Sequence, residues 1–165
     1  MQVSRVCSRL YRSTSALVII FLGVLFACGV GASDNAPAGI TVQMNPQKPL
    51  WLRVTLRSFA STRVTVYKHL LPWGSNRAMV VTAVTEYGQT LEQDLSIDDP
   101  SFAEVSFDPN GSLSGDIDLH ELVRNIDGAV KKSDVHLFWA YKAPQELQLP
   151  RWSGGWVLIP QEKRR

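Results

Sequence analysis

Cysteine is almost absent from this sequence. The two cysteines, Cys7 and Cys28, both lie within the first 32 of the 165 residues. From Ser33 onward the chain therefore has no disulfide, no thiol nucleophile and no thiolate metal site. The roughly 130 residues that remain are enough for one domain, which a hydrophobic core alone must stabilise.

The sequence also lacks an apolar run long enough to span a membrane comfortably. Its longest apolar segment, residues 16–27, is shorter than the ~20 residues that a transmembrane helix needs. Three arginines and no acidic residue precede this segment, and a small-residue exit ending at Ala32 follows it. These three parts predict a secretory signal peptide over residues 1–32 and an exported protein, periplasmic or secreted.

Two alternatives for the leader stay open. In one, the apolar segment is retained as a membrane anchor. In the other, cleavage occurs before Cys28 and a lipid on that cysteine anchors the protein; Leu25 and Ala27 fit this pattern, whereas Phe26 does not. We favour cleavage after Ala32, with residues 33–39 as a flexible lead-in.

No strong charge of either sign is present. The chain has 17 Lys plus Arg and 15 Asp plus Glu, and loss of the leader's three arginines leaves 14 against 15. A domain this close to neutral has no basic field, so we expect no nucleic-acid partner. We expect membrane contact only through the leader or a lipid on Cys28. The basic tail, residues 161–165, is interpreted as a solvated terminus.

Catalytic and metal-binding motifs are missing. His120 opens a His-Glu-x-x-His pattern, but Arg124 occupies the place of the second histidine. Residues 111–115 carry the glycines of a nucleophile elbow, with Leu113 where serine is required. The calcium-like spacing that begins at Asp108 lacks the glycine and the final carboxylate of an EF-hand loop. We therefore predict no catalytic residue, no metal and no cofactor.

What the sequence does contain is alternation of apolar and polar residues with a period of two. This pattern over residues 50–57, 113–119 and 135–141 predicts strands with one buried face. Further strands are expected within residues 64–68, 77–87, 91–95, 102–107 and 156–159. About seven to nine short antiparallel strands over residues 40–160 predict an all-β sandwich or barrel.

One segment has helical periodicity. Apolar residues recur at helical spacing between Leu119 and Val130, with Asp118 as an N-cap and Lys131 at the end. The spacing predicts one short amphipathic helix near residues 119–131.

The position of this helix, just before the strand at 135–141, resembles the helical turn that joins two late strands of immunoglobulin-like domains. The segment Val64–Lys68, followed by Leu71-Pro-Trp-Gly74, is similar to exported immunoglobulin-like domains of uncharacterised bacterial proteins. The resemblance implies an immunoglobulin-like antiparallel β-sandwich with Trp139 in its core. The family's paired cysteines are absent.

Two loops are candidate binding sites. Leu71 and Trp73 lie in one, and Arg151 and Trp152 in the other; tryptophan and arginine are enriched at protein interfaces. The alternative for the first loop is that its apolar residues cap one end of the core. For the second loop, we expect Trp156 to point inward from a hairpin.

Together these features favour an exported, non-enzymatic binding or accessory protein of the cell envelope, whose partner is an unknown protein or envelope component. One alternative is an inhibitor or immunity-type protein directed against a secreted hydrolase. Another is an enzyme whose site is assembled only in the fold, from His69, His136 or the aspartates.

Overall fold

A computed structural model describes residues 39–75, 78–94 and 101–162. The chain divides into two units, Met1–Val30 and Gly31–Arg165, and every described residue belongs to the second. The predicted leader, residues 33–38 of the lead-in and residues 163–165 of the tail lie outside the described residues. Within the described part of the chain, no helix combines the length and hydrophobicity needed to cross a membrane.

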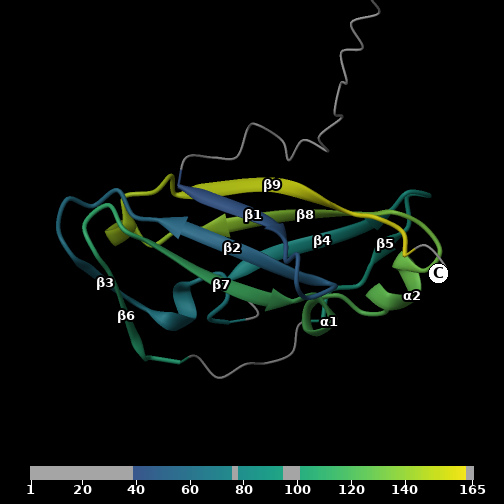
Figure 1. Cartoon of the computed structure of the whole chain (residues 1–165), viewed down its shortest axis with the longest axis horizontal. Coiled ribbons are helices and arrows are strands. Elements are labelled where there is room, and N and C mark those ends of the chain that lie inside the picture. Colours follow the sequence, from purple (N-terminus) through teal and green to yellow (C-terminus); the bar gives the residue numbers. More distant parts are fainter. Residues whose placement is uncertain (1–38, 76–77, 95–100, 163–165) are drawn as a thin grey trace, which may run out of the picture. The chain divides into compact units, whose positions relative to one another are not determined.

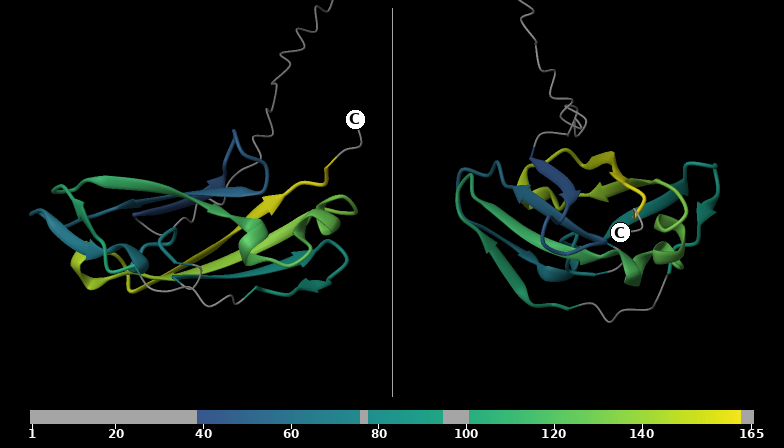
Figure 2. Two further views of the ribbon diagram at one scale, coloured as in Figure 1. Left: turned by 90° about the horizontal axis from the view of Figure 1, so that it is seen from below. Right: turned by 45° about the vertical axis from the view of Figure 1, so that its right-hand side comes forward.

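The described chain is mainly β-structure, and all of its sheets are antiparallel (Figure 1). One sheet has three strands in the order β1 (Ile40–Met44), β2 (Trp51–Arg57) and β7 (Ser112–Asp118). Another has four strands in the order β5 (Thr90–Leu91), β4 (Met79–Thr85), β8 (Val135–Lys142) and β9 (Trp152–Ile159). The third pairs β3 (Val64–Tyr67) with β6 (Glu104–Phe107). Figure 2 shows these sheets from two further directions.

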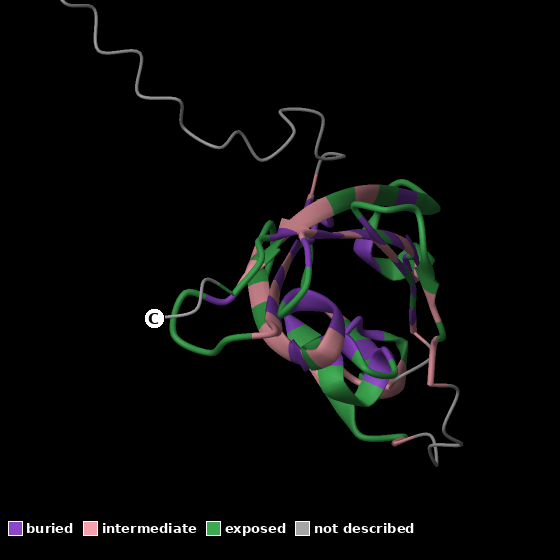
Figure 3. Cartoon of the chain, turned by 90° about the vertical axis from the view of Figure 1, so that its right-hand side faces the viewer, coloured by how far each residue is buried: buried purple, intermediate pink, exposed green. Residues whose placement is uncertain are grey.

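Alternation predicts the buried faces of the long strands correctly. Leu52 and Val54 in β2 are fully buried, as are Val135 and Leu137 in β8, and Trp139 is 6% exposed. These residues belong to one hydrophobic cluster, to which both larger sheets contribute. The predicted core position of Trp139 is thereby confirmed. Figure 3 shows buried and exposed segments alternating along the strands.

The prediction of a single helix over residues 119–131 is wrong. Two short helices are present, α1 (Leu119–Leu122) and α2 (Ile126–Val130). Between them Val123 is extended and forms a β-bridge with Gln93, while Arg124 N donates to Glu92 O at 2.9 Å. The chain therefore pairs with residues 92–94 instead of continuing the helix. The predicted N-cap is confirmed, since the Asp118 side chain accepts from His120 N.

The last strand is longer than predicted, because its glycines conceal the alternation. β9 begins at Trp152, and Gly154 and Gly155 pair with Ala140 and Trp139 of β8. A Cβ at Gly155 would lie 2.9 Å from Trp139 Cζ2, so the absence of a side chain there makes room for the tryptophan ring. Strand β4 ends at Thr85 instead of Tyr87, and β5 ends at Leu91. Arg77 and Leu95, at the outer ends of the two predicted segments, lie outside the described residues.

Two short 3₁₀ helices complete the described elements: η1 (Lys68–Leu70) and η2 (Gln145–Leu147). The end of η1 is tied to the four-stranded sheet, because the Tyr141 hydroxyl donates to Leu70 O at 2.9 Å. Burial raises the pKa of this tyrosine well above its usual value. The hydroxyl therefore keeps its proton and remains a donor.

Candidate binding surfaces

The loop that contains Leu71 and Trp73 packs against the core. Leu71 is fully buried, and Trp73 is partly buried and packed against the core cluster. The Trp73 ring occupies the space that a side chain at Gly115 of β7 would need. Leu71 therefore belongs to the core, as in the alternative interpretation of this loop, and cannot anchor a partner at the surface.

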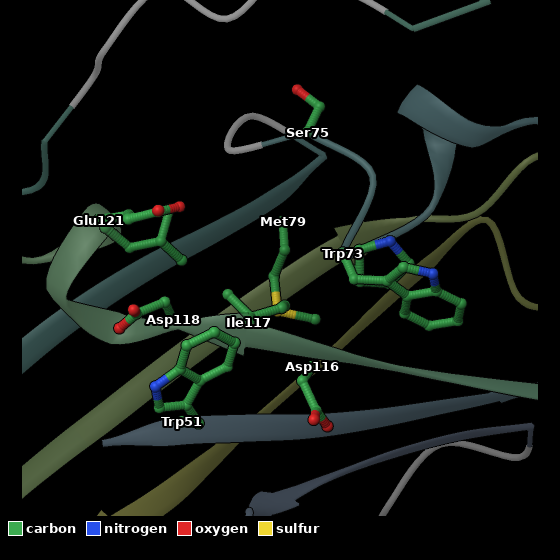
Figure 4. A pocket seen from close by; sticks show the side chains of 10 residues that line it. Trp51, Trp73, Ser75, Met79, Asp116, Ile117, Asp118 and Glu121 are labelled. Carbon is green, nitrogen blue, oxygen red and sulfur yellow. The ribbon is translucent and has the colours of Figure 1, made fainter. Parts of the chain in front are cut away.

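Trp73 also lines a small cavity of about 100 Å³ beside β7 (Figure 4). Trp51 of β2 and Met79 of β4 contribute to the same wall, and the carboxylates come from β7 and α1: Asp116, Asp118 and Glu121. Ligand sites usually have volumes of ~300–1,000 Å³. A cavity of this size accommodates a few water molecules rather than a ligand of ordinary size.

One of the carboxylates at this cavity, that of Asp116, already has partners within the protein. Asp116 accepts from Arg53 Nε at 3.0 Å and from Lys48 Nζ at 3.4 Å. The Arg53 hydrogen bond is the main cause that lowers the pKa of Asp116. Lys48 Nζ also lies 4.2 Å from the centre of the Trp51 ring, a cation–π contact. This network stabilises the outward side of β2 and β7 internally.

His120 lies on the first turn of α1, and both of its ring nitrogens are held by carboxylates. Nδ1 is 2.6 Å from Asp118 Oδ1, and Nε2 is 3.1 Å from Asp127 Oδ1. These contacts, the Asp118 hydrogen bond first, raise the pKa of His120. An imidazole bonded at both nitrogens has no free nitrogen to accept a proton from a substrate.

The three histidines lie in separate surroundings. His69 stacks on Tyr67 with ring centres 5.8 Å apart, and His136 contacts the Trp156 ring at 5.8 Å. His120 is held by the aspartates of the α1–α2 region. In the three described segments, no group of three or more His, Cys, Asp or Glu residues is close enough to hold a metal ion.

A larger cavity, of about 460 Å³, lies near α2 and the end of β9. Its apolar wall is formed by Met44, Leu50, Val130 and Ile159. His120 and Asp127 also line it, but their polar atoms bind each other. The cavity thus presents an apolar surface whose neighbouring histidine is already satisfied.

Trp152 is exposed and starts an apolar surface that continues along β9. Its exposed fraction is 60%, and Arg151 beside it is exposed as well. The expectation that Trp156 points inward is wrong, because this residue is 45% exposed and lies opposite Phe138 of β8. Gly155 takes the inward position, so the strand's side-chain alternation turns Trp156 to the other side.

Three strands of the four-stranded sheet share this outward side. The exposed large hydrophobic residues on it are Val80 of β4 at 53%, Phe138 of β8 at 47%, Trp152 and Trp156. We call this surface the outer face, and the register of β4, β8 and β9 defines it as Val80, Thr82, Val84, His136, Phe138, Ala140, Trp152, Gly154, Trp156 and Leu158. It is a contiguous, mainly apolar surface on a hydrogen-bonded scaffold.

The structure does not combine the two predicted loop sites into one. Trp73 packs toward the core beside Gly115, whereas Trp152 projects from the outer face. Sequence reasoning missed Val80, Phe138 and Trp156 as surface residues. The available signal was Phe138, a large aromatic residue that lies between His136 and Lys142 on the side of the β8 alternation opposite Val135 and Leu137.

Comparisons with known protein families, with curated proteins and with solved structures find no match for this chain.

Proposed function

We propose that this chain is an exported, non-enzymatic binding or accessory protein of the cell envelope, and that its outer face binds a protein partner. The single observation that carries the proposal is the exposure of Val80, Phe138, Trp152 and Trp156 together on one sheet face. Export rests on the basic, apolar and small-residue pattern of the leader.

The size of the outer face supports a docking role. Each aromatic side chain has an area of ~150–250 Å², and the three on this face are about half exposed, so together they present on the order of 300 Å². Contiguous apolar patches larger than a few hundred Å² are rare on monomeric proteins and mark interaction sites. Tryptophan is also enriched among the residues that contribute most to binding energy.

The composition of the outer face favours a protein over a polysaccharide as the partner. A sugar presents many hydroxyl groups that need hydrogen-bond partners when they are buried. Within the outer face only Thr82 and His136 carry polar side chains. The remaining residues suit the apolar centre of a protein interface.

The proposed fold is an immunoglobulin-like β-sandwich. The orders β1-β2-β7 and β5-β4-β8-β9 match strands A-B-E and C′-C-F-G of such domains. The two helices then lie on the connection between strands E and F. One departure is that β6, at the place of strand D, pairs with β3 instead of β7. In this arrangement the outer face is the solvent side of the C′-C-F-G sheet.

Affinity capture from envelope extract tests the proposal. The bait is the chain expressed with its own leader and a C-terminal tag, beside a Phe138→Thr, Trp156→Thr variant. Threonine keeps a high β-propensity at both positions. The matched control is Phe102→Thr, which removes an aromatic that is 70% exposed outside the outer face.

The expected result is a protein that the unchanged chain and the control retain and that the double variant loses, with all three giving the same circular dichroism. Retention of the same proteins by the double variant would show that the outer face is not the docking surface.

A further inference from the structure

We infer that the partner of the outer face is a second copy of this chain, in a two-fold dimer whose facing strands run in opposite directions. The inference rests on the proposed function, because it assigns an occupant to the same face. Four features carry it: the neutral centre of the face, the charges at its two ends, its shape and its area.

The centre of the outer face contains no charged residue. Among the outward positions on β4, β8 and β9, only Lys142 at the end of β8 is charged, and the ten residues of the outer face are all uncharged. A second copy therefore approaches the centre without juxtaposing like charges, which would cost binding energy. A neutral, apolar sheet face of this kind is able to pack against an identical face.

Charges of opposite sign lie at the two ends of the outer face. Lys142 is the last outward residue of β8 and pairs with Trp152, next to Arg151. At the other end lies Glu86, which is exposed and comes directly after β4. It is two residues beyond Val84, so the alternation places it on the same side as the outer face. Glu86 N donates to Asp134 O at 2.9 Å, so this residue continues the ladder beside the start of β8.

These end charges select one of two possible dimers. A two-fold axis parallel to the strands would place each Lys142 opposite the Lys142 of the second copy. An axis perpendicular to the strands, between the two faces, places Lys142 and Arg151 of each copy opposite Glu86 of the other. The second arrangement forms the favourable contact twice, as two-fold symmetry requires, and opposite charges fix the register of the interface.

The shape of the face suits interdigitation. Gly154 and Ala140 are paired neighbours on the outer face and present at most a methyl group between the larger side chains of Trp152 and Trp156. Phe138 and Val80 project nearby. In the dimer, these side chains of one copy pack against Gly154 and Ala140 of the other copy. Packed sheets keep ~10 Å between them and fill that space with interlocking side chains.

The area of the face is consistent with a dimer. A standard interface takes ~800 Å² from each partner, of which a little over half is apolar. The aromatics and Val80 together expose on the order of 350 Å², if each aromatic has an area of ~150–250 Å². The outer face thus supplies most of the apolar centre, and the charged ends contribute to the polar rim.

Sedimentation equilibrium of the full chain, expressed with its own leader and purified from the fraction to which it is exported, tests the inference. We expect a concentration-dependent dimer, and we expect Phe138→Thr, Trp156→Thr to raise its dissociation constant at least ~30-fold, the loss typical of central aromatic residues. The Phe102→Thr control dimerises as the unchanged chain does.

Charge reversal tests the arrangement of the two copies. Lys142→Glu and Glu86→Lys should each weaken self-association about tenfold, because each homodimer then faces like charges at both ends. An equimolar mixture of the two variants should form a heterodimer with nearly the original affinity, since each altered residue meets its opposite. Lys68→Glu, an exposed reversal outside the outer face, is the control and leaves self-association unchanged.

The outcomes separate this inference from the proposed function. Suppose that the chain is a monomer at all concentrations and that only the Phe138→Thr, Trp156→Thr variant loses a captured partner. The inference that the partner is a second copy is then overturned, and the proposed binding function stands. A monomer without any retained partner overturns both. A dimer that tolerates the double variant, or a mixture of charge variants that stays monomeric, also overturns the inference.

Discussion

Two adjacent glycines in β9 allow a direct test of the strand register. Gly155 faces the core, where a Cβ would lie 2.9 Å from Trp139 Cζ2 and 3.1 Å from its Cε2. Gly154 faces outward, and the nearest atom to its Cβ would be Trp139 O at 3.1 Å. Gly155→Ala therefore forces a methyl group against a buried ring, whereas Gly154→Ala needs only a small backbone adjustment.

The expected magnitudes follow from packing and chain entropy. Overfilling a well-packed core costs ~1–3 kcal/mol, and Trp139, at 6% exposed, has little room to move. Both substitutions gain the same ~0.5–1 kcal/mol from restricting the unfolded chain. This gain cancels when the unfolding free energies of the two variants are compared. Gly155→Ala should therefore be less stable than Gly154→Ala by about 1–3 kcal/mol.

Urea unfolding, followed by circular dichroism and tryptophan fluorescence, measures this difference. With a slope of ~1–3 kcal/mol/M for a domain of this size, the midpoints should differ by on the order of 1 M. Near-ultraviolet circular dichroism of folded Gly155→Ala should also change, because the Trp139 ring must shift. Equal midpoints for the two variants would refute the register of β8 and β9 and, with it, the outward orientation of Trp156.

Three further predictions concern single side chains. The pKa of His120 is raised in the folded state, so its contribution to stability is fully present below the unfolded pKa of ~6.5 and is lost as pH rises through the folded pKa. The unchanged chain should therefore exceed His120→Gln in stability by less at pH 9 than at pH 6, which urea midpoints at the two pH values measure. Tyr141→Phe removes the hydrogen bond to Leu70 O and should cost ~1 kcal/mol in thermal unfolding; an unchanged melting temperature would contradict that bond. Leu137→Ala should cost ~2–5 kcal/mol in urea because the side chain is fully buried, and Phe138→Thr on the opposite side of the strand should cost less than half as much.

Strand prediction succeeded where one face of a strand is apolar and the other polar. β2 follows this pattern closely, with Leu52, Val54 and Leu56 all fully buried. It failed for the start of β9, because glycine carries no side chain to reveal which side faces the core. The helix prediction failed at Val123, where pairing with Gln93 outweighs helical propensity.

The candidate site was only partly visible along the chain. Trp152 stood out because tryptophan beside arginine in a loop is typical of interfaces. Phe138 and Val80 come from two other strands, and neither was predicted as a binding residue from its own segment. Their common exposure becomes evident only when β4, β8 and β9 are aligned.

Composition and periodicity decide what kind of domain this chain forms. The lack of cysteine after residue 28 excludes disulfides from the domain, and repeated alternation commits the chain to antiparallel strands, because both properties depend on residue type and local spacing. Register, strand order and the choice of which apolar side is covered depend on contacts between residues far apart in the chain. The Trp139 ring lies over Gly155 because β8 and β9 pair at one particular offset, and that offset leaves Trp156 and Phe138 on the outer face.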